Sequence, residues 1–80
     1  MRVFETIREI LIKISGLQSI QLTDNIQNDL AMDSLAMVML LIEIEECFGI
    51  ELDESDMNPL ELILVSDVVD LVERYMNDEE

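Results

Sequence analysis

The chain has 80 residues, half of them hydrophobic, and 19 acidic against four basic residues give it a formal net charge of -15. A chain of this length is enough for one compact domain with one small core. Its carboxylates would repel nucleic-acid phosphates and anionic membrane surfaces, so we expect neither as a partner.

The composition also limits the fold class and the chemistry. Two Gly and one Pro accompany long runs of Leu, Ile, Val, Met and Glu, which favours an all-α fold. With no His and one Cys, we expect no metal site, no internal disulfide and no catalytic residues. Neither a leader pattern nor an apolar run of about 18 residues is present, and we expect a cytoplasmic monomer.

The first predicted helix covers residues 3–15. Apolar residues recur there at intervals of three and four, from Val3 to Ile14, with charged residues on the other face. Gly16 follows directly and can close the helix in a left-handed conformation. Residues 16–33 are rich in Gln, Asn, Asp, Ser and Thr and are predicted to form a long loop held by apolar anchors. Loops of this length are usually functional.

The second predicted helix covers residues 34–48, a stretch without Gly or Pro. Its helical wheel has two apolar faces. We assign one to the core: Met37, Leu40, Leu41, Ile44 and Phe48. The other is either buried as well or offered to a partner: Leu35, Val38, Met39 and Ile42. Cys47 lies near the core face and is predicted to be a buried apolar residue.

A short third helix is predicted after Gly49 and an acidic loop. Asn58 is a suitable cap, Pro59 suits the first helical position, and Glu61 lies three residues after the cap. Together these signals place a helix over residues 59–63.

The last helix is predicted over residues 66–77, with the hydroxyl of Ser66 as its cap. No linker or repeat divides the chain, so residues 1–80 are predicted to form a single domain. We expect a four-helix bundle of three main helices, with the short third helix closing one side.

The most informative motif is Asp33-Ser34-Leu35, at the start of the second predicted helix. By itself it indicates only a helix cap, because Asp and Ser oxygens accept unpaired backbone N–H groups. With the helix order, the long loop, the acidity and the ending Glu45-Glu46-Cys47-Phe48-Gly49-Ile50, it resembles the acyl carrier proteins of fatty-acid and polyketide synthesis. The resemblance covers nearly the whole chain; Ala31 stands where the family commonly has Gly.

The resemblance implies a role for Ser34. A phosphopantetheinyl transferase would attach a 4'-phosphopantetheine arm from coenzyme A to the Ser34 hydroxyl, and the arm would carry acyl groups as thioesters. Asp33 and Leu35 complete the motif, and Asp33 would help the transferase bind magnesium. The chain itself would be a non-catalytic carrier, because it has no His to activate the hydroxyl.

The second helix would then be the surface that partner enzymes recognise. By resemblance, Val38 and Ile42 offer apolar contacts, and Glu43, Glu45 and Glu46 meet basic patches. The partners implied are the transferase and the acyl-transfer, chain-elongating or chain-modifying enzymes of fatty-acid, polyketide or other specialised pathways.

Three alternatives stay open. The carrier could hold aminoacyl, peptidyl or D-alanyl groups. Ala36 and Met39 stand where fatty-acid carriers commonly have acids, so a dedicated carrier of a specialised pathway is a further reading of the same class. A different class is an acidic interaction module that occupies a basic cleft and acts unmodified.

Overall fold

A computed structural model describes residues 3–58 and 60–78. Within these ranges the chain forms three α-helices and one turn of 3-10 helix: α1 (Val3–Ser15), α2 (Ser34–Phe48), η1 (Glu54–Asp56) and α3 (Val65–Asp78). The described part contains no strand, only an isolated antiparallel bridge between Asn25 and Leu64. The predicted all-α class is confirmed. None of the helices in these ranges has the length and apolarity needed to cross a membrane.

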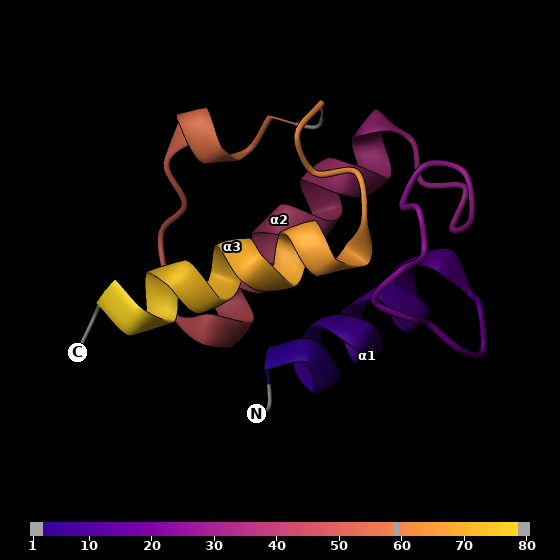
Figure 1. The fold of residues 1–80 in the computed structure, drawn as a ribbon, viewed down its shortest axis with the longest axis horizontal. Helices are drawn as coiled ribbons and strands as arrows, with labels where there is room; N and C mark the ends of the chain where they lie inside the picture. Colours follow the sequence, from indigo (N-terminus) through magenta and orange to yellow (C-terminus); the bar gives the residue numbers. More distant parts are fainter. Residues whose placement is uncertain (1–2, 59, 79–80) are drawn as a thin grey trace.

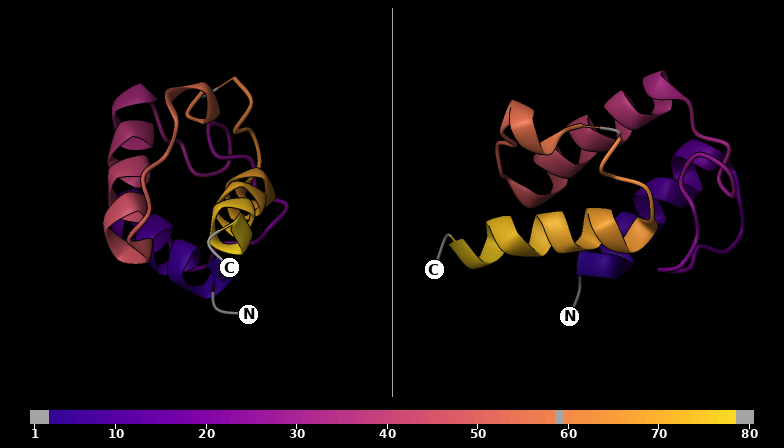
Figure 2. Two further views of the ribbon diagram at one scale, coloured as in Figure 1. Left: turned by 90° about the vertical axis from the view of Figure 1, so that its left-hand side faces the viewer. Right: turned by 45° about the horizontal axis from the view of Figure 1, so that its top comes forward.

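The helix α1 packs against both other helices (Figure 1). In the left view of Figure 2, α2 and α3 stand on either side and α1 runs across below them. The connection from α2 to α3, residues 49–64, passes along the side opposite α1 (Figures 1 and 2). The core is therefore closed by helices on three sides and by this connection on the fourth.

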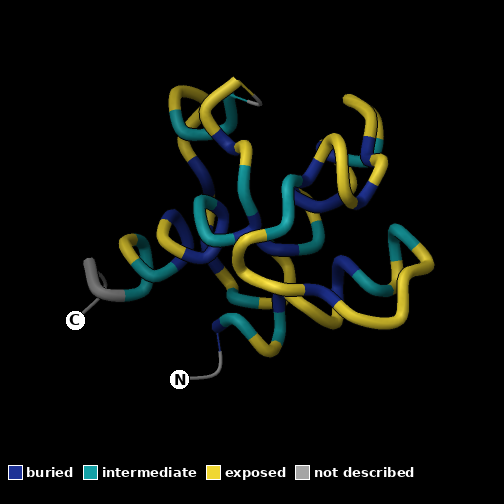
Figure 3. Tube along the Cα trace, turned by 45° about the vertical axis from the view of Figure 1, so that its right-hand side comes forward, coloured by how far each residue is buried: buried dark blue, intermediate teal, exposed yellow. Residues whose placement is uncertain are grey.

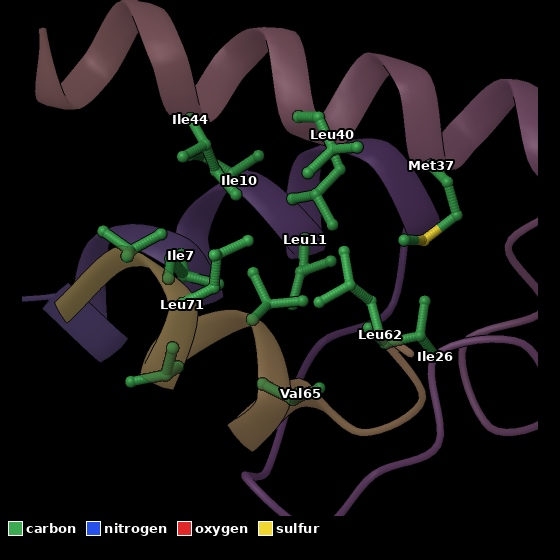
Figure 4. Packing of buried hydrophobic residues seen from close by; sticks show 14 of the residues in the cluster. Ile7, Ile10, Leu11, Ile26, Met37, Leu40, Ile44, Leu62, Val65 and Leu71 are labelled. Atoms are coloured by element: carbon green, nitrogen blue, oxygen red, sulfur yellow. The ribbon is translucent and has the colours of Figure 1, made fainter. Parts of the chain in front are cut away.

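The core is wholly apolar among the described residues (Figure 4). Its largest fully buried side chains come from all three helices and from the long loop: Ile7, Leu11, Ile26, Leu40, Ile44, Val65, Val68 and Val72. The face of α2 assigned to the core does face inward, with Met37, Leu40, Leu41 and Ile44 buried and Phe48 packed against them. Burying each Leu or Ile side chain contributes about 1.5–3 kcal/mol.

The long loop before α2 is held by buried apolar side chains, as Figure 3 shows by its dark blue positions. These anchors are Ile20, Ile26, Leu30 and Met32. Gly16 closes α1 with a φ of 78°, and its N–H donates to the Ile12 carbonyl at 2.9 Å. The loop is also fastened to the start of α3, because the N–H of Val65 donates to the Asp24 carbonyl at 3.0 Å.

The short helix predicted over residues 59–63 does not form in the described part of that range; Pro59 lies outside the described residues. Leu60 and Glu61 form a turn, in which the Glu61 N–H donates to the Asn58 carbonyl at 3.0 Å. The turn does not continue, because the Ile63 N–H donates to the Asp67 Oδ2 at 3.1 Å while the Ile63 carbonyl accepts the N–H of Ile26 in the long loop at 2.8 Å. Pairing with the loop therefore overrides the local helix signal.

The 3-10 turn η1 lies instead in the acidic stretch that was predicted to be a loop. Its cap is Asp53, whose side chain accepts from the Ser55 N–H at 3.1 Å. The predicted bundle of four helices is thus corrected to three α-helices and this 3-10 turn within the described ranges.

The start of α3 also differs from the prediction. The helix begins at Val65, and Ser66 lies inside its first turn. Asp67 acts as the capping side chain, because its Oδ2 accepts from the N–H of Ile63 at 3.1 Å and of Leu64 at 2.9 Å. A carboxylate that reaches back along the chain replaces the expected hydroxyl cap.

Candidate functional site

The motif Asp33-Ser34-Leu35 lies where the long loop enters α2. Asp33 is the N-cap: its backbone is extended and its Oδ1 accepts from the Ala36 N–H at 2.9 Å. Ser34 is therefore the first residue of the helix, and it is exposed. Since the Asp33 carboxylate supplies the cap, the Ser34 hydroxyl is free of that role, and capping alone does not explain a serine here.

The two residues before the motif set its position. Met32 is buried, and its N–H donates to the Ile26 carbonyl at 3.2 Å, which holds the end of the loop against the core. Ala31 has a φ of 54°, the left-handed conformation. That conformation costs a residue with a side chain about 1–2 kcal/mol and costs Gly almost nothing. The position where the family commonly has Gly is thus one where the backbone conformation favours it.

The start of α2 has two opposing electrostatic features next to Ser34. The first N–H groups of a helix lack intrahelical acceptors and form the positive end of the helix dipole, which favours a phosphate. The Asp33 carboxylate lies beside them and disfavours one. No other acid occurs in the first turn of α2. The arrangement therefore fits a phosphodiester on Ser34, with one repulsive neighbour.

The second apolar face of α2 is open to solvent. Leu35 is 68% exposed, and Val38, Met39 and Ile42 are each about half exposed. Of the two readings left open by the sequence, central burial is wrong. The exposed face begins next to Ser34 and continues along α2, which places an apolar surface beside the candidate attachment residue.

Glu43, predicted to dock partners, pairs within the molecule. Its Oε2 lies 2.9 Å from the Nζ of Lys13 on α1. This hydrogen bond raises the pKa of the Lys13 ammonium above its ordinary value, with smaller contributions from the charges of Glu43, Cys47 and Glu46. Lys13 therefore neutralises much of the charge that Glu43 would show to a partner.

Glu45 also serves the fold. Its Oε2 accepts from the Leu52 N–H at 2.8 Å, in a partly buried position. Its carbonyl accepts from the N–H of Ile50 at 3.2 Å and from Gly49, which closes α2 with a φ of 66°. Of the three acids predicted for docking, Glu46 is the one that is exposed.

A contact from α3 to the next residue of the same connection was not predicted from the sequence. The Tyr75 hydroxyl on α3 accepts from the Asp53 N–H at 2.8 Å and donates to the Asp56 Oδ2 at 2.6 Å. The hydrogen bond to Asp56 is the main cause that raises the pKa of Tyr75 above its ordinary value. The consecutive backbone amides of Leu52 and Asp53 thus donate to Glu45 on α2 and to Tyr75 on α3. The only signal was a Tyr in an apolar stripe, whose hydroxyl usually finds a partner.

Cys47 is exposed, so the predicted burial is wrong. It lines a shallow pocket at the edge of the contact between α1 and α2, together with Lys13 and Glu43. Within residues 3–58 and 60–78, no group of three or more His, Cys, Asp or Glu side chains is placed to hold a metal ion.

Comparison with known proteins adds a family to this geometry. Residues 5–72 match the family model described as the phosphopantetheine attachment site. The chain is 35% identical over 75 residues to an acyl carrier protein of Campylobacter hominis, covering 91% of this chain and 92% of that protein. It is 33% identical over 76 residues to an acyl carrier protein of Campylobacter concisus, covering 92% and 96%.

Proposed function

The chain belongs to the acyl carrier protein family, and from this premise we propose that Ser34 is the residue that carries its phosphopantetheine. The observation that carries the proposal is the placement of Ser34 as the exposed first residue of α2, with capping left to Asp33. When bound, the arm supplies a terminal thiol that holds acyl groups as thioesters.

The chain's own part in the attachment is that of a substrate. The Ser34 oxygen would attack the phosphorus of coenzyme A that bears the arm, forming one P–O bond as the P–O bond from that phosphorus to adenosine bisphosphate breaks and the adenosine bisphosphate leaves. The hydroxyl proton must pass to a base of the transferase, because this chain has no His. The helix terminus would then stabilise the new phosphodiester by about 0.3–1 kcal/mol.

The surface beside Ser34 supports a proposal about partners. Leu35, Val38 and Ile42 form an exposed apolar strip, and Glu46 adds an exposed acid farther along α2. We propose that partner enzymes, the transferase among them, cover this strip and meet Glu46 with a basic residue. Ala36 and Met39 leave the start of α2 without acids, which favours partners of a specialised pathway over those of housekeeping fatty-acid synthesis.

Loading by a transferase tests the attachment site. Incubation with coenzyme A, magnesium and a broad-specificity phosphopantetheinyl transferase should add the mass of one phosphopantetheine to the wild type. Ser34→Ala should gain none, whereas Ser19→Ala, at another exposed serine of the preceding loop, should load like the wild type. Equal labelling of Ser34→Ala and the wild type would contradict the proposal.

The cargo decides between the acyl carrier and the aminoacyl, peptidyl or D-alanyl carriers. Mass spectrometry of the loaded protein from its own host would identify the thioester. An acyl group supports the acyl reading, and an amino acid on the arm would overturn it.

A further inference from the structure

A pocket of about 230 Å³ opens between the long loop and the segment that precedes α3. Its lining is uncharged and has two chemically different parts: the amide side chains Asn25, Gln27 and Asn28, and the apolar side chains Leu60 and Ile63. The volume is below the roughly 300–1,000 Å³ of pockets that enclose a complete small ligand. It therefore suits one segment of an extended, uncharged ligand.

The lining groups are available to such a ligand. The Asn25 Oδ1 accepts from the N–H of Gln27 at 3.0 Å and of Asn28 at 2.9 Å, which fixes the Asn25 side chain at the pocket. The side chains of Gln27 and Asn28 are exposed. Leu60 is 78% exposed and Ile63 is 49% exposed. Two apolar side chains thus lie open to solvent opposite uncharged hydrogen-bonding groups.

Backbone hydrogen bonds place this pocket near Ser34. The Ile26 N–H donates to the Ile63 carbonyl at 2.8 Å, and the Met32 N–H donates to the Ile26 carbonyl at 3.2 Å. Ser34 follows Met32 by two residues, which span at most about 7 Å. Figures 1 and 2 likewise show the start of α2, the loop before it and the segment before α3 gathered at one end of the molecule.

We propose that this pocket holds the middle of the phosphopantetheine arm carried on Ser34. That part of the arm contains two amide bonds and a carbon with two methyl groups. The amides match the Gln27 and Asn28 side chains as hydrogen-bonding partners, and the methyl groups match Leu60 and Ile63. The inference rests on the proposed attachment at Ser34 and adds a resting place for the arm between visits to partner enzymes.

Nuclear Overhauser effects (NOEs) in the loaded protein test the pocket. Isotope-labelled protein is converted with unlabelled coenzyme A, and loading is first verified by mass. We expect NOEs from the geminal methyl groups of the arm to the methyl groups of Leu60 and Ile63, and shifts of the Gln27 and Asn28 side-chain amide signals relative to the unloaded protein.

Ile63→Ser should remove at least half of the NOE intensity between the arm and Leu60. Leu17→Ser is the control, because it also replaces an exposed apolar side chain, 39% exposed, outside the lining of the pocket and away from α2. It should leave the arm contacts unchanged. Gln27→Ala, in the exposed loop, gives a second readout that does not depend on how well Ile63→Ser folds.

The outcomes separate the pocket from the attachment site. A protein that does not load on Ser34 overturns both proposals. A fully loaded protein whose arm signals match free phosphopantetheine, or whose arm contacts other residues, overturns the pocket alone. Equal effects of Ile63→Ser and Leu17→Ser on the arm contacts would overturn it too.

Discussion

The two halves of α2 use their side chains in opposite ways. From Ser34 to Ile42 the outer face is apolar and exposed. From Glu43 to Phe48 two of the acids are engaged inside the molecule, Glu43 by Lys13 and Glu45 by the Leu52 N–H. The outer face of the first half, although apolar, is offered to solvent, whereas Glu45 in the second half, although an acid, serves the fold.

This contrast assigns recognition and stability to different segments of one helix. The exposed strip lies next to Ser34, where, under the proposed attachment, a partner enzyme would approach the arm. The engaged acids lie where α2 contacts α1 and the connection to α3. Substitutions of the exposed residues Leu35, Val38 and Ile42 should therefore change partner binding with little change in stability, and substitution of Glu45 should do the reverse.

Glu45→Ala should produce the largest loss of stability among the acids of α2. It removes the acceptor of the partly buried Leu52 N–H, which should lower the free energy of unfolding by about 1–3 kcal/mol. Urea titration followed by circular dichroism measures the change. Glu46→Ala, at an exposed acid, serves as the control and should change stability by no more than about 0.5 kcal/mol. Equal losses of unfolding free energy in the two variants would contradict a structural role for Glu45 that Glu46 lacks.

The double substitution Val38→Ser with Ile42→Ser should weaken recognition. Both side chains are half exposed, so the fold should lose little, while the transferase loses apolar contact. We expect kcat/KM for loading to fall about tenfold, which corresponds to about 1.4 kcal/mol. Glu43→Gln should lower it less, because Lys13 already neutralises Glu43. A larger effect of Glu43→Gln would reverse the assignment of the recognition surface.

Tyr75→Phe tests the hydrogen bonds that join α3 to the connection between α2 and α3. Loss of the hydrogen bonds to Asp53 and Asp56 should cost about 1 kcal/mol at neutral pH. The folded protein raises the pKa of Tyr75, so this contribution is present below its usual pKa of about 10 and is lost as the pH rises through the folded value.

Unfolding measured between about pH 7 and pH 11 should show wild type and Tyr75→Phe converging at the alkaline end. A difference in stability that stays constant over this range would mean that the phenol proton plays no part.

Lys13→Gln should have the smallest effect. The pair with Glu43 is exposed on the Lys13 side, and exposed ion pairs contribute little and are screened by salt. The melting temperature should fall slightly at low ionic strength, with no difference from wild type near 1 M salt. Lys13→Arg should retain the pair. A loss for Lys13→Gln that persists at high salt would show that packing, not charge, joins α1 to α2 here.

Sequence patterns predict those parts of the fold that depend on local periodicity. The bounds of α1 and α2 agree with the ranges expected from apolar spacing and from the glycines that follow. The core face of α2 is also as predicted. The segment after Asn58 is different, because the Ile63 carbonyl pairs with Ile26, far away in the sequence. A capping signature contains no information about such a distant partner.

The candidate site shows the same limit. Asp33-Ser34 could be recognised as a helix start, and the structure divides the roles by giving the cap to Asp33. The engagement of Glu45 could not be predicted, since it depends on an N–H seven residues later in an irregular connection. Cys47 was predicted to be buried but is exposed, because its position on the helical wheel does not show where the contact between α1 and α2 ends.

The left-handed backbone at Ala31 has an evolutionary consequence. Alanine and glycine codons differ by a single base, so the strain at this position lies within one point mutation of relief. Alanine at this position costs about 1–2 kcal/mol of stability relative to glycine. Alanine also has fewer accessible backbone conformations than glycine. The backbone just ahead of Asp33-Ser34 is therefore more rigid, and so is the position of the serine on which the biosynthetic cargo would travel.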